Sequence, residues 1–357
     1  MLRIVLFPFS FLFGFITCVR NKLYDWKCLS STQYDDIYVI SVGNITVGGT
    51  GKTPFVEYLL RSLSQRYQIA TLSRGYKRAT KGFRFVTAQT TPQQVGDEPY
   101  QIKQKFPDVV VAVDVDRRRG ITNIRKDYPE IQIILLDDAF QYRKIKPNLS
   151  ILLTDYSRPL YRDSMLPAGR LREWACFAKR ADIMVVTKLP AEIKPEEQQN
   201  MKQYYAKIFP NDIFFSVIEY NEPLPVFSNN QKISTADLRK YEVLLITGIA
   251  NPSPFEDYIR RFAASVQTIS FPDHHAFTEK DMVYIAGKWN EKNTNHKLLV
   301  TTEKDAVRLQ QMNIQETLKR NSYYAPICFR FSGMISSDAT SFDFWISRKL
   351  DDFFAKE

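Results

Sequence analysis

The segment 37–54, with the sequence IYVISVGNITVGGTGKTP, constrains the fold more than any other part of the chain. Its first six residues are β-branched or aromatic apart from one serine, which is typical of a buried parallel strand. Glycines then end the strand pattern, and Pro54 suits the first turn of a helix. Apolar residues follow at helical spacing, at Phe55, Leu59, Leu60 and Leu63. The segment therefore predicts a strand, a glycine-rich turn and a helix.

This turn resembles a phosphate-binding loop with one departure. The general pattern is G-x-x-x-x-G-K-[ST], and Thr46 stands at the position of its first glycine. The glycines let backbone N–H groups converge on an anion, and the helix start favours phosphate. A glycine-rich turn with an accidental Lys-Thr is the alternative. Because a strand precedes the turn and a helix follows, we predict that the chain binds a nucleoside triphosphate.

Each residue of this loop has an expected role. Lys52 would contact the β- and γ-phosphates, and the Thr53 hydroxyl would bind Mg²⁺. The full set of expected nucleotide-binding residues is Thr46, Val47, Gly48, Gly49, Thr50, Gly51, Lys52 and Thr53.

Length and charge narrow the class of protein only in part. The 357 residues suffice for two domains or for one large α/β unit. The net charge of +10 indicates an anionic partner, but it does not choose among nucleic acid, a phosphorylated metabolite and a membrane lipid. The four cysteines form no C-x-x-C pair, so neither a disulfide framework nor a zinc site is indicated. A reduced, cytoplasmic setting is expected.

Strands and helices alternate up to about residue 220, which predicts a doubly wound, mostly parallel sheet of the phosphate-loop NTPase type. One strand, at 131–138, ends in Asp137 and Asp138. Open α/β sheets place ligand chemistry at such strand ends, where an aspartate can hold Mg²⁺. The two acids could instead cap the next helix, but the upstream loop favours the metal role.

A second, smaller α/β domain is predicted after a linker at 220–232 that is rich in proline and polar residues. Its strands are expected near 243–247, 266–271 and 297–302, and residues 342–354 form an amphipathic closing helix. The predicted divisions are an apolar membrane-associating helix at 1–25, a core domain at 26–222, the smaller domain at 223–340, and a C-terminal helix at 341–357 that packs back on the core.

Residues 4–19 are almost wholly apolar. As a helix they would span about 24 Å, short of the roughly 30 Å hydrocarbon core of a membrane, and Pro8 would break or kink them. No small-residue cleavage site of a signal peptide follows. Two interpretations stay open: a buried N-terminal helix, or an aromatic segment that enters one leaflet of a membrane.

Several other segments are ambiguous when taken singly. The run 73–84 holds five basic residues and no acid, and could be a solvated loop or a surface for phosphate or anionic lipid. Turn-like acids lie at 96–99, a loop entering a helix at 166–173, and a charged turn at 301–308. Two of the three histidines lie at 271–277, and three are too few for a histidine-rich metal site.

Together, these segments resemble one family, the bacterial tetraacyldisaccharide 4'-kinases of lipid A biosynthesis. The resemblance covers nearly the whole chain, in the family's order. Its motifs are the apolar N-terminus, VGNITVGGTGKTP at 42–54, SRGY at 73–76, GDEP at 96–99, LDDAFQ at 136–141, LPAGRLRE at 166–173, GIANP at 248–252, FPDH at 271–274 and EKDAVR at 303–308. Thr46 is usual in this family. Ala139 and Tyr142 depart from its common glycine and histidine.

The resemblance implies transfer of the ATP γ-phosphate to the 4'-hydroxyl of a tetraacylated disaccharide 1-phosphate. It implies Asp97 as the base that accepts the hydroxyl proton, with His274 as its partner, and catalytic roles for Lys52 and Asp138. The expected metal ligands are Thr53, Asp137, Asp138 and Glu98. The expected cofactors are ATP and Mg²⁺.

The same resemblance implies where the enzyme works and with what. We expect an acylated disaccharide lipid substrate, a membrane surface, no nucleic acid and no protein partner. The expected location is the cytoplasmic face of the bacterial inner membrane, held peripherally or monotopically. Two other classes remain as rivals: a membrane-associated regulatory NTPase, and a nucleic-acid-dependent ATPase suggested by the net charge.

Overall fold

The computed structural model describes residues 2–190, 193–227, 232–273, 275–332 and 341–355. The chain divides into two compact units. The first comprises Met1–Ile218 together with Phe329–Glu357, and the second comprises Glu219–Cys328. The chain thus returns to the first unit at residue 329, before the closing helix that the sequence predicts from residue 341.

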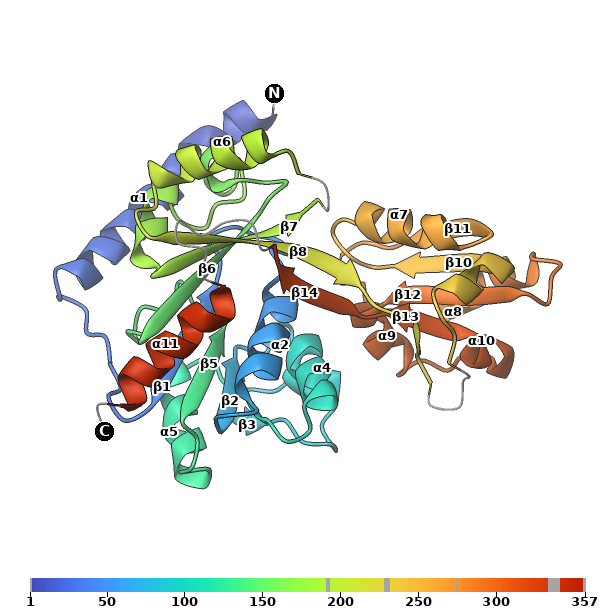
Figure 1. The fold of residues 1–357 in the computed structure, drawn as a ribbon, viewed down its shortest axis with the longest axis horizontal. Coiled ribbons are helices and arrows are strands. Elements are labelled where there is room, and N and C mark those ends of the chain that lie inside the picture. Colours follow the sequence, from blue (N-terminus) through green and yellow to red (C-terminus); the bar gives the residue numbers. More distant parts are fainter. Residues whose placement is uncertain (1, 191–192, 228–231, 274, 333–340, 356–357) are drawn as a thin grey trace. The chain divides into compact units, whose positions relative to one another are not determined.

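A nine-stranded sheet forms the centre of the first unit (Figure 1). Its order is β14-β8-β7-β6-β1-β5-β2-β4-β3, and the pairs among β8, β7, β6, β1, β5, β2 and β4 are parallel. The strands are β1 (Tyr38–Gly43), β2 (Ile69–Ser73), β3 (Arg84–Phe85), β4 (Val110–Val113), β5 (Ile133–Asp137), β6 (Leu149–Asp155), β7 (Ile183–Leu189), β8 (Asp212–Tyr220) and β14 (Ile327–Phe331).

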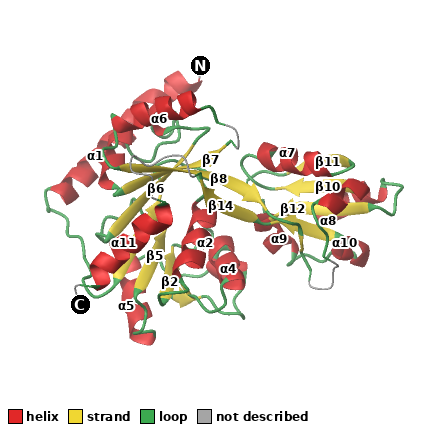
Figure 2. Cartoon of the chain, viewed as in Figure 1, coloured by secondary structure: helices red, strands yellow, loops and turns green. Residues whose placement is uncertain are grey.

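Helices cover both faces of this sheet, as expected for a doubly wound fold (Figure 2). The helices of the first unit are α1 (Leu2–Asp25), α2 (Lys52–Leu63), α3 (Pro92–Val95), α4 (Asp97–Lys105), α5 (Arg117–Asp127), α6 (Pro195–Ala206) and α11 (Phe342–Phe354), with 3-10 turns η1 (Leu160–Arg162) and η2 (Ala175–Arg180).

The central strand β1 shows why both faces are apolar. Tyr38, Ile40 and Val42 enter one core with α2, α4 and α11, while Val39 enters a second core with α5. Because successive side chains of a strand point to opposite faces, a strand buried on both sides is apolar throughout. The continuous apolar pattern of the sequence at this strand is therefore confirmed, as is the mostly parallel sheet.

The second unit is built around a five-stranded sheet of order β11-β10-β12-β13-β9. Pairs among the first four strands are parallel, and the short strand β9 pairs antiparallel. Its elements are β9 (Leu224–Pro225), η3 (Ala236–Lys240), β10 (Glu242–Thr247), α7 (Ser253–Phe262), β11 (Ser265–Ser270), α8 (Glu279–Asn290), β12 (Lys297–Thr302), α9 (Glu303–Leu309), α10 (Glu316–Arg320) and β13 (Ser322–Ala325).

Helix α1 differs from its prediction in one respect. It continues through Pro8 as one helix, so the expected break does not occur. Its stretch Val5–Asp25 is long and apolar enough to cross a membrane, and 22% of the most apolar part is buried. The buried positions are Ser10, Gly14, Thr17 and Asn21, which are small or polar. The large apolar side chains face outward, so a helix buried by its apolar face is excluded.

Candidate functional site

The glycine-rich loop joins β1 to α2 at the carboxyl edge of the sheet, in the middle of the strand order. Gly48 and Gly51 have φ angles of 116° and 81°, in the region where a side chain is strained. Gly51 precedes α2, so the first N–H groups of that helix face the loop. The predicted strand, turn and helix are present, and the local geometry suits an anion.

Side chains from β7 and from Asn44 form hydrogen bonds with the loop. The Thr187 hydroxyl, on β7, donates to the carbonyl of Thr50 at 2.8 Å. The Lys188 ammonium donates to the carbonyl of Gly49 and lies 2.8 Å from the Asp155 carboxylate. Asn44 donates to the Thr50 hydroxyl at 2.7 Å. These bonds use two carbonyl groups and one hydroxyl of the loop and none of its N–H groups.

Asp138 lies between two cations. Its carboxylate is 3.6 Å from the Lys52 ammonium and 3.1 Å from the Arg172 guanidinium. Burial works to raise the pKa of Asp138, but Lys52 and Arg172 outweigh it, and the pKa lies below its usual value. Its φ of 48° is unusual for a residue with a side chain. Asp138 is therefore held ionised beside the lysine of the loop.

Asp137 has the opposite environment. It is only 4% exposed, and its Oδ1 has no hydrogen-bond partner. Burial, followed by the nearby charge of Glu98, raises the pKa of Asp137 to about 7, with Lys52 opposing. A buried carboxylate oxygen without a partner, close to other acids, is an arrangement that a cation would complete.

Glu98 and Asp97 open helix α4, and the structure shows why this motif belongs to the site. The charge of Glu98 acts on Asp137, so the start of α4 lies near the end of β5. A Cβ on Gly96 would lie 3.1 Å from the carbonyl of Tyr76, which packs the SRGY segment against this helix start. The spacing gives no indication of these approaches, because about 40 residues separate 97–98 from 137–138; only the family resemblance groups Glu98 with Asp137 and Asp138.

Arg117 is a site residue to which the sequence assigned no role. It is 4% exposed, its Nε has no partner, and its guanidinium lies 5.4 Å from the ring of Tyr142. Burial lowers the pKa of Arg117, while Asp138 opposes this. The Tyr142 hydroxyl donates to Asp116 at 2.7 Å, which fixes the ring. The departure from histidine at position 142 thus places an aromatic surface beside a buried cation.

The segment 165–173 lies against the start of the loop and supplies Arg172, another residue without a predicted role. Its backbone pairs with the loop through Val47 N–H to the Arg170 carbonyl at 2.8 Å and Arg172 N–H to the Ile45 carbonyl at 2.7 Å. After this loop the chain forms the 3-10 turn η2. In the sequence, these contacts are indicated only by the LPAGRLRE motif at 166–173, which is one of the motifs that carry the family resemblance.

Three motifs of the second unit converge on the carboxyl ends of its parallel strands. The buried Asp305 accepts the Gly248 N–H at 2.8 Å and the Thr302 hydroxyl at 2.7 Å, and it pairs with Arg308 at 3.0 Å. A Cβ on Gly248 would lie 3.6 Å from the carbonyl of Pro272. The segments 248–252, 271–273 and 303–308 are therefore neighbours. His274 lies outside the described residues.

No three His, Cys, Asp or Glu side chains form a metal-holding group within the described part of the chain. A magnesium ion bound with a nucleotide takes most of its ligands from phosphates and water and needs only one or two carboxylates. The unpartnered Asp137 oxygen, with Asp138 and Glu98 close to it, fits that smaller requirement.

Comparisons with known proteins give one consistent result. Residues 2–344 match the protein family described as "Tetraacyldisaccharide-1-P 4'-kinase". The chain is 46% identical to the tetraacyldisaccharide 4'-kinase of Parabacteroides distasonis, covering 86% of this chain and 84% of that one. It is 44% identical to that of Flavobacterium johnsoniae, covering 92% of both.

A solved structure agrees in fold. The crystal structure of LpxK from Aquifex aeolicus in complex with ATP matches with a TM-score of 0.76 at 28% identity, covering 99% of this chain and 100% of that one.

Proposed function

The chain belongs to the tetraacyldisaccharide-1-P 4'-kinase family, and from this and the site's geometry we infer how its residues transfer a phosphate. The enzyme is a kinase that moves the γ-phosphoryl group of ATP to the 4'-hydroxyl of a tetraacyldisaccharide 1-phosphate. The product is the bis-phosphorylated precursor of lipid A. The matched relatives are named as kinases, so the regulatory-NTPase alternative is not favoured.

One observation carries the assignment of the site. Lys52, at the end of the glycine-rich loop, faces the ionised Asp138 while the neighbouring Asp137 keeps a buried oxygen without a partner. Phosphoryl transfer depends mainly on positioning the phosphates and neutralising their charge. The loop N–H groups would hold the phosphates of ATP, and Lys52 would contact the β- and γ-phosphates.

We assign Mg²⁺ to the acids on the β5 side of this loop. Thr53, Asp137, Asp138 and Glu98 would hold it, directly or through water. When bound, the ion supplies positive charge against the phosphate oxygens. The raised pKa of Asp137 and its unpartnered oxygen support this assignment, because a cation would offset the cost of burying a carboxylate there.

Asp97 is our candidate for the base that accepts the sugar hydroxyl proton. It is the first residue of α4, next to Glu98, whose charge reaches Asp137 at the end of β5. A carboxylate becomes a better base when a second group orients it. His274 is the partner that the family resemblance implies. The pairing stays a prediction, because His274 is outside the described residues.

The exposed apolar side chains of helix α1 support the proposal that the enzyme acts at a membrane surface. Its outward side carries exposed aromatic and aliphatic side chains, at Val5, Phe7, Phe9, Phe11, Leu12, Phe13, Phe15, Ile16 and Val19. A contiguous exposed apolar stripe of this kind marks a binding surface, and an interfacial helix is its simplest use for an enzyme with an acylated substrate. We place it on the cytoplasmic face of the inner membrane, where ATP is available.

The acceptor assay tests this function. Purified protein is incubated with Mg-ATP and tetraacyldisaccharide 1-phosphate in detergent micelles, and the consumption of acceptor and ATP is compared. We expect one acceptor phosphorylated per ATP consumed. ATP hydrolysis without a bis-phosphorylated product would overturn the kinase assignment and revive the regulatory NTPase.

Variants test the assigned roles. Lys52→Ala and Asp138→Ala should lower kcat/KM by about 10²–10³ through lost phosphate and metal handling. Asp97→Ala should lower kcat by about 10²–10⁴ with ATP affinity largely kept. Lys126→Ala, on the exposed side of α5, and Asp108→Asn, on an exposed turn, are the matched controls. Near-normal turnover of Asp97→Ala would exclude it as the base.

A further inference from the structure

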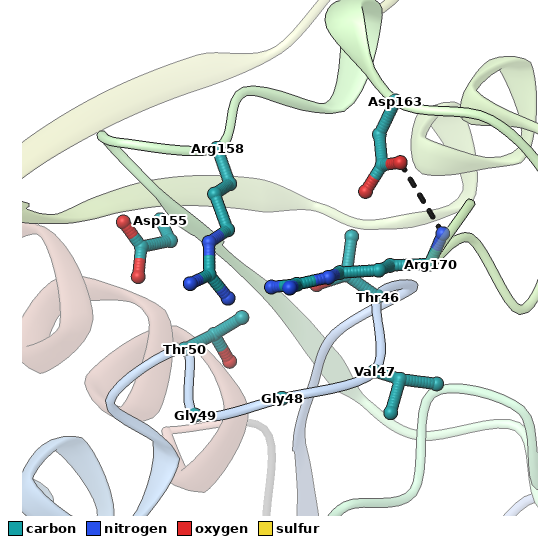
Figure 3. A pocket seen from close by; sticks show the side chains of 9 residues that line it. All are labelled: Thr46, Val47, Gly48, Gly49, Thr50, Asp155, Arg158, Asp163 and Arg170. Atoms are coloured by element: carbon teal, nitrogen blue, oxygen red, sulfur yellow. Dashed lines mark hydrogen bonds between the residues drawn. The ribbon is translucent and has the colours of Figure 1, made fainter. Parts of the chain in front are cut away.

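Two arginines converge on the glycine-rich loop, Arg158 from the end of β6 and Arg170 from the segment 165–173. Arg158 and Arg170 line a pocket whose floor is the loop segment 46–50 (Figure 3). Both guanidinium groups point over this segment and toward one another. A Cβ on Gly48 would lie 3.8 Å from the Arg158 guanidinium nitrogen Nη1. Two like charges directed at the same small space are stabilised when an anion lies between them.

The acids that also line this pocket are bound elsewhere. The Asp155 carboxylate accepts hydrogen bonds from Lys188 at 2.8 Å and from Ser157 N–H and hydroxyl at 2.8 and 2.7 Å. Asp163 accepts the backbone N–H groups of Ser164 and Arg170 at 2.8 and 3.2 Å. Among the described residues, neither arginine side chain has an ion pair or a hydrogen bond. Their charges therefore remain available to a ligand.

The pocket walls are fixed to the loop itself. The Arg170 carbonyl accepts the Val47 N–H at 2.8 Å, and the neighbouring residue Leu171 forms a β-bridge with Thr46. Arg158 follows the end of β6, where its N–H donates to the Asp155 carbonyl at 3.0 Å. Both arginines thus hold a defined place relative to the glycines, as a built phosphate site requires.

The order of the sheet indicates which part of a nucleotide this pocket would meet. Strand β1, which leads into the loop, lies between β5 and β6. The acids and the proposed magnesium position are on the β5 side, whereas Arg158 follows β6. In phosphate loops the lysine reaches the β- and γ-phosphates, while the glycine backbone cradles the α- and β-phosphates. Groups above Gly48 and Gly49 would therefore face the phosphates nearer the nucleoside.

We propose that Arg158 and Arg170 form a second wall of the nucleotide site and bind the α- and β-phosphates of ATP. Arginine suits this task because its planar guanidinium forms paired hydrogen bonds with phosphate oxygens. The inference rests on the proposed function, since it takes the loop as the phosphate site. The lipid acceptor also carries a phosphate, so the test must separate the two sources.

The experiment measures ADP binding by titration calorimetry, because ADP carries both phosphates and is not turned over. For Arg158→Ala and Arg170→Ala we expect the Kd of ADP to rise about tenfold. Arg158→Lys keeps the positive charge but cannot form the paired hydrogen bonds of a guanidinium. For this variant we expect the Kd of ADP to rise by about threefold. Arg162→Ala is the matched control, since Arg162 is an exposed arginine on the same segment that does not line the pocket. Thermal unfolding checks that each variant is folded.

Kinetics then assign the source of the phosphate. A rise in the KM for ATP in both alanine variants, with the KM for the lipid unchanged, supports the proposal. A rise in the KM for the lipid alone, with wild-type ADP affinity, overturns it and gives the pocket to the acceptor. Unchanged affinity for both ligands also overturns it.

The failure of the proposed function is a different result. If Lys52→Ala binds ADP as the wild type does, the loop is not the phosphate site. If the wild type phosphorylates no acceptor while the arginine variants lose ADP affinity, the kinase function is wrong, but the binding of nucleotide phosphates by Arg158 and Arg170 is supported.

Discussion

Helices α1 and α11 lie near opposite ends of the chain, and both are rich in aromatic residues. Helix α11 buries its large apolar side chains, whereas α1 exposes most of its own. In α11 the apolar residues Phe342, Ile346 and Leu350, at helical spacing, are almost completely buried against the sheet. In α1 the residues turned toward the protein are small or polar, and Phe11 is 64% exposed. The first helix is therefore inverted relative to an ordinary surface helix.

The contacts of α1 explain how a helix can pack by its polar side. The Ser10 hydroxyl accepts the Ala168 N–H at 2.9 Å, and Asn21 donates to the buried Glu173 at 2.9 Å. Gly14 leaves room for the ring of Trp174. The buried side of α1 is thus held by hydrogen bonds, whereas the buried side of α11 is apolar and its hydrogen bonds lie at exposed positions such as Asp343 and Asp351. Apolar composition alone does not say which side of a helix will be buried.

The largest expected effect concerns the polar attachment of α1. Glu173 binds Arg180 at 2.7 Å and Arg20 at 3.3 Å, and it is fully buried. Glu173→Ala would leave the largely buried Arg180 guanidinium without its ion-pair partner and Asn21 without its acceptor, so we expect the free energy of unfolding to fall by about 4 kcal/mol. Urea denaturation in detergent measures this. A loss below about 1 kcal/mol would show that α1 is held by its apolar contacts, as α11 is.

A cavity between α11 and the sheet should lower the free energy of unfolding slightly less than the loss of Glu173 does. Leu350→Ala removes a fully buried side chain from the main core of the first unit, and the free energy of unfolding should fall by about 3 kcal/mol. Phe344→Ala, at a position that is 62% exposed on the same helix, should change it by less than about 0.5 kcal/mol. Equal effects of the two variants would contradict the burial of this face.

The outward side of α1 gives the next prediction. Phe11→Ser should weaken binding to lipid vesicles by about 1.5 kcal/mol, roughly tenfold, while the free energy of unfolding in detergent stays within about 0.5 kcal/mol. Vesicle sedimentation and denaturation are measured on the same sample. Phe344→Ser is the control on α11, and its vesicle binding should match the wild type. A stability loss without a binding loss would mean that Phe11 packs against protein.

The smallest expected effect comes from charge next to α1. Lys22 is exposed in the last turn of the helix. Lys22→Gln should weaken binding to vesicles with anionic lipid by about 1 kcal/mol, with no change for neutral vesicles, because basic residues near an anionic surface each contribute about this much. Raising the salt concentration should remove the difference. Lys126→Gln is the control, and a similar loss there would indicate a general effect of net charge.

The sequence predicts the local elements well where local chemistry decides them. The helix expected at 342–354 and the strand expected at 297–302 are confirmed at those bounds. The loop between β1 and α2 also follows from its own residues, since glycine, lysine and proline each restrict the backbone there. Helix α1 continuing through Pro8 shows the limit, because a tightly attached helix can tolerate one lost hydrogen bond.

Contacts between segments that are distant in sequence could not be predicted from the residues themselves. Nothing near Glu98 indicates that it lies close to Asp137, and nothing near Arg158 indicates that it points over Gly48. These contacts depend on the order of strands in the sheet, which pairs β1 with β6 and β5 rather than with the next strand along the chain. Asp137 and Asp138 were found because they lie at the end of a strand, whereas the arginines lie on irregular segments without such a signal.

The segment 168–173 contacts two parts of the protein that are distant in sequence, helix α1 and the phosphate site. At one end Ala168 is bonded to Ser10 of α1, and at the other Glu173 is bonded to Asn21. Between them Arg172 holds Asp138, and Arg170 is bonded to the loop. With α1 lying in the interface as we propose, six residues set the height of the phosphate loop above the lipid surface. The enzyme would then reach only hydroxyl groups at one fixed distance from the bilayer, so the anchor itself would select which sugar position is phosphorylated.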